Sequence, residues 1–257
     1  MLELFDPSTI AILAVVAFLA GFIDAVAGGG GMLTVPALLS IGLPPHIVLG
    51  TNKLAATFAS STAALTYYRK KLFSPTFWRQ AFFATLVGAI LGTLLVNYIS
   101  TAWLEKALPL IILAIAVYTI WHPQPKVDGH ALPKDDPKLK TKQWGQGLTL
   151  GFYDGVVGPG TGAFWVVSSM SMYKMNMLLS SGLAKAMNFT SNITSLITFI
   201  ILGHVNWAIG LTMGIFLMMG AFIGAHSAIR FGSAFIRPVF ITVVVILSVK
   251  LAIDAWF

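Results

Sequence analysis

The chain has 257 residues, of which 57% are hydrophobic and 10% are charged, and a net charge of +7. An ordinary soluble domain carries about 25% charged residues. The composition therefore excludes a soluble enzyme, a nucleic-acid-binding domain, a disordered chain and a secreted disulfide scaffold, and it predicts an all-α, polytopic helical membrane protein. The sequence has no cysteine, which excludes disulfides, iron–sulfur clusters and thiolate zinc sites, and we expect neither a metal nor another cofactor.

Eight apolar stretches follow one another along the chain: residues 8–41, 46–68, 77–98, 103–121, 145–173, 177–202, 207–229 and 235–256. About 20 residues cross the hydrocarbon core as a helix. The first and fifth stretches are longer and are broken by glycine. No basic cluster precedes the first stretch, so we expect no cleaved signal peptide. A polar linker with four prolines and five lysines, residues 122–143, separates a first repeat, residues 1–121, from a second, residues 144–257, and is expected to be irregular and cytoplasmic.

The two halves of the chain are repeats of each other. The segment GFIDAVAGGG at residues 21–30 aligns with GFYDGVVGPG at residues 151–160, and six of the ten positions are identical. Further along, an offset of 132 residues pairs Lys53 with Lys185 and Gly88 with Gly220. We interpret these matches as an internal duplication.

The positions of Lys and Arg predict how the segments cross the membrane. They gather in the connection after the second stretch, in the linker, after the fifth stretch and after the seventh, whereas the turns near Ser100 and Gly203 have none. Because cytoplasmic loops are enriched in Lys and Arg, this pattern favours re-entrant first and fifth stretches, three crossings in each half, and inverted repeats. The alternative is eight plain crossings in parallel repeats, since residues 8–27 alone are long enough to span.

The glycine runs are the first candidate site. Glycine-interrupted segments at matching places in two repeats indicate a transporter substrate site, and a helix that starts after each run offers amides that favour an anion. Tight packing of helices through small residues is the alternative. The candidate substrate-binding residues in these runs are Gly28, Gly29, Gly30, Gly31, Gly158, Gly160, Thr161 and Gly162.

Charged residues at matching places inside apolar stretches are the second candidate. Lys53 and Lys185 are costly in a membrane and therefore indicate function; they would attract an anion, pair with Asp24 and Asp154, or extend toward an interface. Asp24 and Asp154 are candidates for binding a coupling proton, because burial disfavours the charged carboxylate; a structural role is the alternative.

Polar residues surround the two lysines. Asn52 and Thr57 lie on the second stretch, and Asn188 and Asn192 share a helix face with Lys185. This arrangement suits a hydrogen-bonding wall for an oxyanion, although hydrogen bonds between helices are the alternative. The GxxxG spacings at residues 88–92 and 220–224 would join helices within one subunit or between the subunits of a homodimer.

The motifs resemble those of the TauE/SafE family, also called the sulfite exporter or TSUP family. The similarity covers nearly the whole chain and is carried by AGFIDAVAGGGG at residues 20–31, LTVPALL at 33–39, GTNKL at 50–54, and GFYDG followed by GPGTG from residue 151 to residue 162. The resemblance implies a multi-pass transporter in the bacterial inner membrane that carries sulfite, an organosulfonate such as sulfoacetate, or thiosulfate.

The residues and the resemblance together predict a secondary transporter for a small sulfur-containing anion. We expect the two glycine runs to meet near the midplane, with alternating access as one repeat moves against the other. The expected partners are the anion, the lipid bilayer and a coupling proton, without nucleic acid. A passive anion channel and a transporter of another organic anion, such as a carboxylate, are the alternatives. An intramembrane enzyme lacks a nucleophile–base pair here, and a scaffold has no need of glycine-broken segments.

Overall fold

The computed structural model describes residues 6–104, 106–108, 110, 132–134 and 137–232, and within these residues it contains helices and no strand. Most of the predicted stretch 103–121 and all of the stretch 235–256 lie outside the described residues. The helices, in chain order, are α1 (Pro7–Ala27), α2 (Gly31–Ser40), α3 (Pro45–Arg69), α4 (Arg79–Asn97), α6 (Pro137–Val156), α7 (Thr161–Tyr173), α8 (Met177–Ile201) and α9 (Trp207–Phe231). The prediction of an all-α, polytopic helical protein is confirmed.

The first and fifth predicted stretches are each divided into two helices at a glycine run. Helix α1 begins at Pro7, where the Asp6 carboxylate accepts hydrogen bonds from the amides of Ser8 and Thr9, and it ends at Gly28, whose φ of 82° is left-handed. The second break uses the same device, since Gly158 has a φ of 93° and Gly160 a φ of 80°. Residues with a Cβ avoid this region, so glycine ends each long helix and allows the chain to turn.

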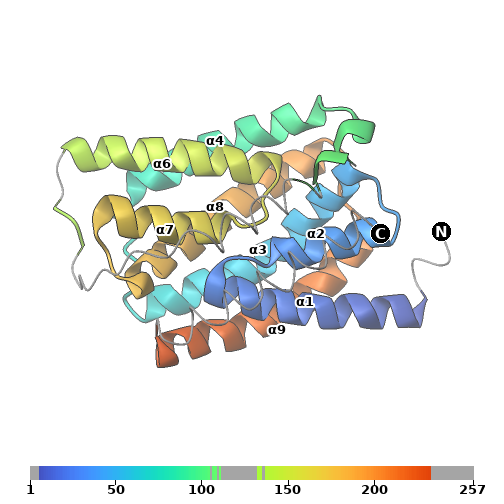
Figure 1. The fold of residues 1–257 in the computed structure, drawn as a ribbon, viewed down its shortest axis with the longest axis horizontal. Helices are drawn as coiled ribbons and strands as arrows, with labels where there is room; N and C mark the ends of the chain where they lie inside the picture. Colours follow the sequence, from blue (N-terminus) through green and yellow to red (C-terminus); the bar gives the residue numbers. More distant parts are fainter. Residues whose placement is uncertain (1–5, 105, 109, 111–131, 135–136, 233–257) are drawn as a thin grey trace.

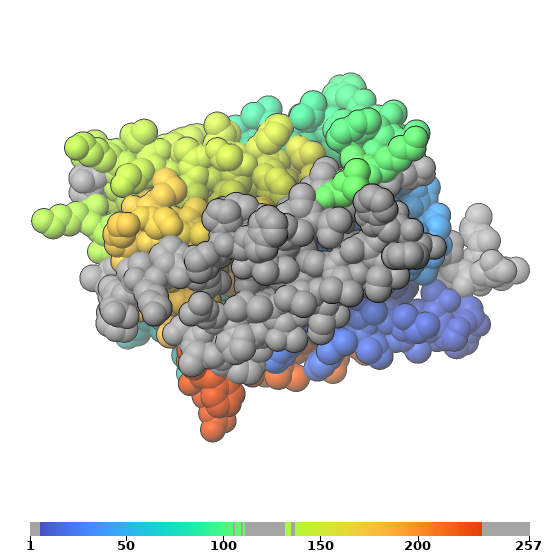
Figure 2. Space-filling view, viewed as in Figure 1, coloured from blue at the N-terminus to red at the C-terminus, as the bar shows by residue number. Residues whose placement is uncertain are grey.

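The helices run roughly parallel to the long axis of the molecule (Figure 1). The start of α1 and the end of α2 lie at one end, together with the α8–α9 turn, while the α3–α4 connection, the start of α6 and the end of α9 lie at the other. Figure 2 shows the same two ends in space-filling form, with α1 and α6 along opposite edges. Orientation across a membrane and inversion of the repeats stay predictions.

Two bundles, built from both halves of the chain, make up the described residues. Helices α1, α2, α3 and α9 share one hydrophobic core, which contains Leu13, Val35, Ala59 and Met213. A second core, which contains Trp165, joins α7 and α8 to the start of α4 and of α6, and it also includes Val26 and Ala27 at the end of α1 and Ala228 near the end of α9. Each bundle therefore includes a helix from the other repeat: α9 belongs with the first bundle and α4 with the second. Helices α3 and α8 pack against each other where the bundles meet.

Glycines form the close helix–helix contacts, here called seams, that attach α9 to α1 and α4 to α6. On α4, a Cβ at Gly88 or Gly92 would collide with the backbone of α6, and on α9 a Cβ at Gly220 or Gly224 would collide with the backbone of α1. The two seams use residues that are equivalent in the repeat. The GxxxG spacings thus join helices within one chain, which answers the question that the sequence left open.

The end of the predicted linker is helical and not irregular. Helix α6 begins at Pro137 and not at residue 145, because proline is well suited to the first position of a helix. Its first turns are amphipathic: Leu139 and Gln143 are buried. The Gln143 side chain accepts a hydrogen bond from the Ala81 amide at 3.3 Å and donates one to the Phe77 carbonyl at 3.3 Å, which attaches α6 to the start of α4.

Helices α1, α4 and α9 are long and apolar enough to cross a membrane, with mean hydropathy of 2.6, 1.7 and 2.0. Helices α3 and α8 have 25 residues each, which corresponds to about 37 Å, but they are more polar. Their polar residues are buried between the bundles. The functional candidates therefore lie on helices that the other helices shield.

Candidate functional site

The two helix breaks touch each other at the interface of the bundles. A Cβ added to Gly28 would lie 2.5 Å from the Ala163 amide nitrogen, and one added to Gly31 would lie 3.1 Å from the Cα of Pro159. Segments about 130 residues apart in the sequence are thus in backbone contact. Only residues without a Cβ allow this approach at Gly28, which explains why glycine occupies that position.

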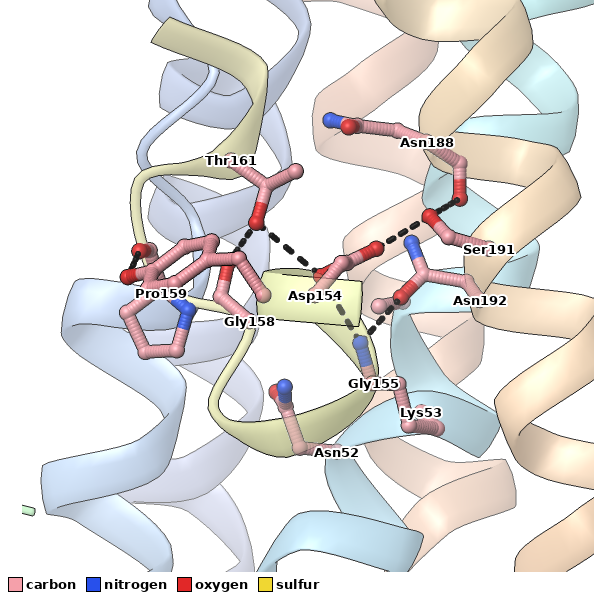
Figure 3. A network of polar contacts seen from close by, with 12 residues as sticks. Asn52, Lys53, Asp154, Gly155, Gly158, Pro159, Thr161, Asn188, Ser191 and Asn192 are labelled. Carbon is pink, nitrogen blue, oxygen red and sulfur yellow. Dashed lines mark hydrogen bonds and ion pairs between the residues drawn. The ribbon is translucent and has the colours of Figure 1, made fainter. Parts of the chain in front are cut away.

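Lys53 forms a buried ion pair with the aspartate of the other repeat. Its Nζ lies 2.8 Å from Asp154 Oδ1 and donates to Asn192 Oδ1 at 3.2 Å. The same carboxylate accepts from Thr161 Oγ1 at 3.1 Å and, on its other oxygen, from the Ser191 hydroxyl. Figure 3 shows Asp154 surrounded by these donors. Both side chains of the pair are at most 4% exposed, so Asp154 is a fully hydrogen-bonded, buried carboxylate.

Lys185 faces the aspartate of the first repeat, but with a different geometry. Its Nζ donates to the backbone carbonyl of Asp24 and lies 3.7 Å from the Asp24 carboxylate. The Asp24 side chain is 18% exposed, and its Oδ1 accepts a hydrogen bond from the Gly30 amide at 3.2 Å. The pairing of each lysine with an aspartate, which the sequence left as one of three options, is thus present, and it crosses from one repeat to the other.

A small polar cavity lies where the breaks meet the central helices α3 and α8. Its volume is about 30 Å³, which is room for one or two water molecules. Its lining combines both breaks with residues of both central helices. The lining residues are Asp24, Gly28, Gly31, Asn52, Lys53, Ala56, Asp154, Gly158, Gly160, Thr161, Gly162, Asn188 and Asn192.

The Asn188 amide is the polar group of this cavity whose bonding is incomplete. The residue is 5% exposed, and its Oδ1 has no hydrogen-bond partner among the described residues. In Figure 3 the side chain extends from α8 toward the break that carries Thr161. By contrast, Asn52 accepts a 2.6 Å hydrogen bond from Thr34. A buried amide without a partner costs free energy, and this cost is relieved when a ligand or water occupies the cavity.

The structure brings most of the predicted site residues together. Four of them lie outside the lining: Gly29, Gly30, Thr57 and Lys185. Gly30 donates to Asp24 and Lys185 faces Asp24, so both lie just behind the wall, whereas Thr57 donates to the Lys53 carbonyl of its own helix at 2.7 Å. Sequence reasoning missed Ala56, which lines the cavity. Ala56 is equivalent to Asn188 in the repeat at the offset of 132 residues, and this equivalence would have identified Ala56 as a candidate.

Two serines on the central helices α3 and α8 bond to residues of the site. Ser191 donates to Asp154, and Ser60 accepts a 3.5 Å hydrogen bond from Asn192. The site as a whole contains two ammonium and two carboxylate groups, so its net charge is near zero when all four are ionised. Polar donors and a lysine around a cavity suit an oxyanion. Protonation of one aspartate would leave an unmatched lysine for that anion.

Comparison with known proteins gives the family. The family described as "Sulfite exporter TauE/SafE" matches residues 13–251. The chain is 38% identical over 256 residues to a "Probable membrane transporter protein" of Haemophilus influenzae, with 96% of each chain covered. It is 35% identical over 256 residues to the "Probable membrane transporter protein YfcA" of Escherichia coli K12, with 97% of this chain and 92% of the relative covered. No solved structure matches. The chain therefore belongs to the TauE/SafE family of multi-pass membrane transporters.

Proposed function

We propose that this protein is a secondary transporter of a small sulfur-containing anion, such as sulfite, sulfoacetate or thiosulfate, in the bacterial inner membrane. The observation that carries the proposal is the polar cavity at the contact of the two helix breaks, which is lined by the buried Lys53 and by Asn188, whose amide N–H groups can donate to an anion. An ammonium group, amide N–H groups and a hydroxyl are donors of the kind that recognise an oxyanion. The family description, "Sulfite exporter TauE/SafE", supports the sulfur chemistry.

The size of the cavity favours alternating access over an open pore. A volume of about 30 Å³ holds one or two waters, which is too little for a sulfonate. The anion must therefore enter while the bundles separate at this contact. A passive channel would need a continuous water-filled path, whereas the two breaks are in close contact beside the cavity. This geometry supports a carrier in which the site opens to one side at a time.

The packing of the helices favours moving units other than the two repeats that the sequence analysis expected. The seams attach α9 to α1 and α4 to α6, so the repeats cannot separate without breaking them. We propose that the bundle of α1, α2, α3 and α9 moves against the bundle of α4, α6, α7 and α8. Spin labels test this motion: the distance between Ile12→Cys and Tyr98→Cys, both exposed, should change when the anion is added, whereas that between Ile12→Cys and Leu211→Cys should not.

The two aspartates differ in how suitable they are for proton coupling. Asp154 accepts three side-chain hydrogen bonds, including that of Lys53, and this bonding suits a structural role. Asp24 is more exposed, and its carboxylate lies 3.7 Å from Lys185. We assign the coupling proton to Asp24. A neutral Asp24 leaves the positive charge of Lys185 for the anion, so that an anion and a proton would bind together.

Flux into proteoliposomes tests the proposal. The wild type should take up labelled sulfite, sulfoacetate or thiosulfate saturably and respond to an imposed pH gradient. Asn188→Ala should lower flux at least about tenfold, because the loss of a well-placed polar contact to a charged ligand costs about 1.5–3 kcal/mol. Thr57→Ala is the matched control, since Thr57 bonds to its own helix and lies outside the lining; this variant should transport normally.

The other outcomes point to other functions. Flux that does not saturate and ignores the pH gradient would indicate a passive channel. Carboxylate flux without flux of any sulfur anion would keep the site and change the substrate. Equal loss of flux in Asn188→Ala and Thr57→Ala would remove the evidence that the cavity is the binding site. Asp24→Asn should abolish the response to the pH gradient, and persistence of that response would refute the assignment of the proton.

A further inference from the structure

A second, much larger hollow lies on a different side of α8 from the polar cavity. It has a volume of about 660 Å³, in the range of about 300–1,000 Å³ that small-molecule sites occupy. It lies between the last turns of α3, the connection to α4, the first turn of α4 and the middle of α8. Leu65, Phe82 and Phe83 form much of its wall and are each more than 40% exposed. The face of α8 that lines it is opposite the face that carries Lys185 and Asn192.

This groove is apolar along its length and basic at one end. It follows α3 from Ser61 to Tyr68, a rise of roughly 10 Å, and Arg79 lies at the end where α4 begins. Residues 69–71, in the connection beside it, are Arg, Lys and Lys and are all exposed. The sequence from residue 54 to residue 104 contains no Asp or Glu.

Arg79 forms no ion pair with an acidic side chain among the described residues. The ion pairs in the part of the chain that the structure describes are those of Lys53 and Lys185, so Arg79 has no acidic partner there. A positive charge in the first turn of a helix is also unfavourable with respect to the helix dipole. The arginine therefore does not stabilise α4, and an anion from outside the chain would compensate its charge.

We propose that the groove binds an anionic phospholipid. One acyl chain would lie along Leu65, Phe82 and Phe83, and the phosphate would contact Arg79, with Arg69, Lys70 and Lys71 nearby. Basic pockets between transmembrane helices bind lipid headgroups in this way, and each basic residue near the surface contributes about 1 kcal/mol. The apolar groove fits the acyl chain of a phospholipid, and the arginine at its end fits the phosphate of the headgroup. A free phosphate ion would leave the apolar wall unoccupied.

Native mass spectrometry of the purified, full-length protein tests this site with phosphatidylglycerol and phosphatidylcholine of the same acyl chains. We expect the wild type to retain phosphatidylglycerol at least about fivefold better. Arg79→Gln should remove this preference, because one basic contact corresponds to a factor of about five. Arg230→Gln is the matched control: it removes another exposed arginine, at the end of α9, and should keep the preference.

A second variant tests the apolar half of the groove. Ala64→Phe fills the groove without changing charge, so it should lower the retention of both lipids. Each variant is first checked for a wild-type elution volume and melting temperature, and exposed Arg79 gives a usable variant even where Ala64→Phe does not fold. Equal retention of the two lipids by the wild type, or an equal effect of Arg79→Gln and Arg230→Gln, overturns the proposal. Wild-type retention in a folded Ala64→Phe protein overturns it as well.

Discussion

The two buried ion pairs give a quantitative prediction, because they have the same composition but different geometry. Lys53→Met keeps the length of the side chain and removes its charge. It leaves Asp154, which is 3% exposed, with the hydroxyls of Thr161 and Ser191 and without a counter-ion. Breaking a buried pair by removing one partner costs about 3–5 kcal/mol. We expect a loss of that size in the free energy of unfolding.

Lys185→Met should cost less. The ammonium group of Lys185 bonds to a backbone carbonyl and lies 3.7 Å from the Asp24 carboxylate, whose side chain is 18% exposed. Asp24 can therefore be hydrated after its partner is removed. The expected loss is that of a charge-assisted hydrogen bond, about 1.5–3 kcal/mol. The order of the two variants, and not only their magnitude, follows from the structure.

Equilibrium unfolding in mixed micelles, followed by tryptophan fluorescence, measures both variants. A double-mutant cycle with Asp154→Leu completes the experiment. Because a matched apolar pair can replace a buried ion pair at little cost, Lys53→Met combined with Asp154→Leu should recover about 3 kcal/mol relative to the sum of the single changes. A loss below about 1 kcal/mol for Lys53→Met, or a larger loss for Lys185→Met, would refute the reasoning.

Three further predictions concern the breaks, the α8–α9 turn and the cavity. Gly28→Ala should destabilise the protein far more than Gly42→Ala. Both glycines have a positive φ, which costs a residue with a Cβ about 1–2 kcal/mol, but only the Cβ at Gly28 would collide with backbone atoms. Equal melting temperatures of the two variants would contradict the contact between the breaks. Burial and the neighbouring His46 lower the pKa of His204, so the unfolded state binds the proton more tightly and stability should fall as pH drops below about 6.5. His204→Gln should flatten this dependence and His226→Gln should not, as thermal unfolding between pH 5 and 8 would show. Asn188→Leu should abolish flux while keeping or raising the melting temperature, because the buried Oδ1 of Asn188 has no partner to lose; a large destabilisation would assign this residue a structural role.

Much of the site was predictable because charge and glycine are costly in membrane helices. Lys53 and Asp154 stand out in apolar segments, and the glycine runs interrupt two helices at matching places. The structure brings these features to one cavity. The spacing of the residues in the sequence could not predict which aspartate pairs with which lysine. Lys53 pairs with Asp154, 101 residues away, and not with Asp24. That choice depends on how the repeats interlock, which no local pattern encodes.

Other features of the structure were not predictable because the local sequence pattern indicates something else or nothing specific. The start of α6 was hidden by a proline-rich, lysine-rich composition that is typical of solvated linkers, although Pro137 is at a position where proline favours a helix. The polar residues around the lysines included Ser60 and Ser191, but their partners on other helices were not predictable, since both hydroxyls also bond to their own helix. For such residues the deciding fact is the neighbour on another helix, and this fact is available only after packing.

The glycine seams explain why the site lies where it does. Because α9 is fixed on α1 and α4 on α6 by backbone contacts at Gly220 and Gly88, each bundle contains parts of both repeats. The remaining interface, between α3 and α8, is where the lysines are placed, and each lysine bonds to a residue of the opposite bundle. Movement at this interface must therefore break or exchange these bonds. In the transport cycle that we propose, an anion that compensates a lysine, together with a proton that neutralises an aspartate, would lower the cost of that exchange, so the groups proposed to recognise the substrate would also control the motion that carries it.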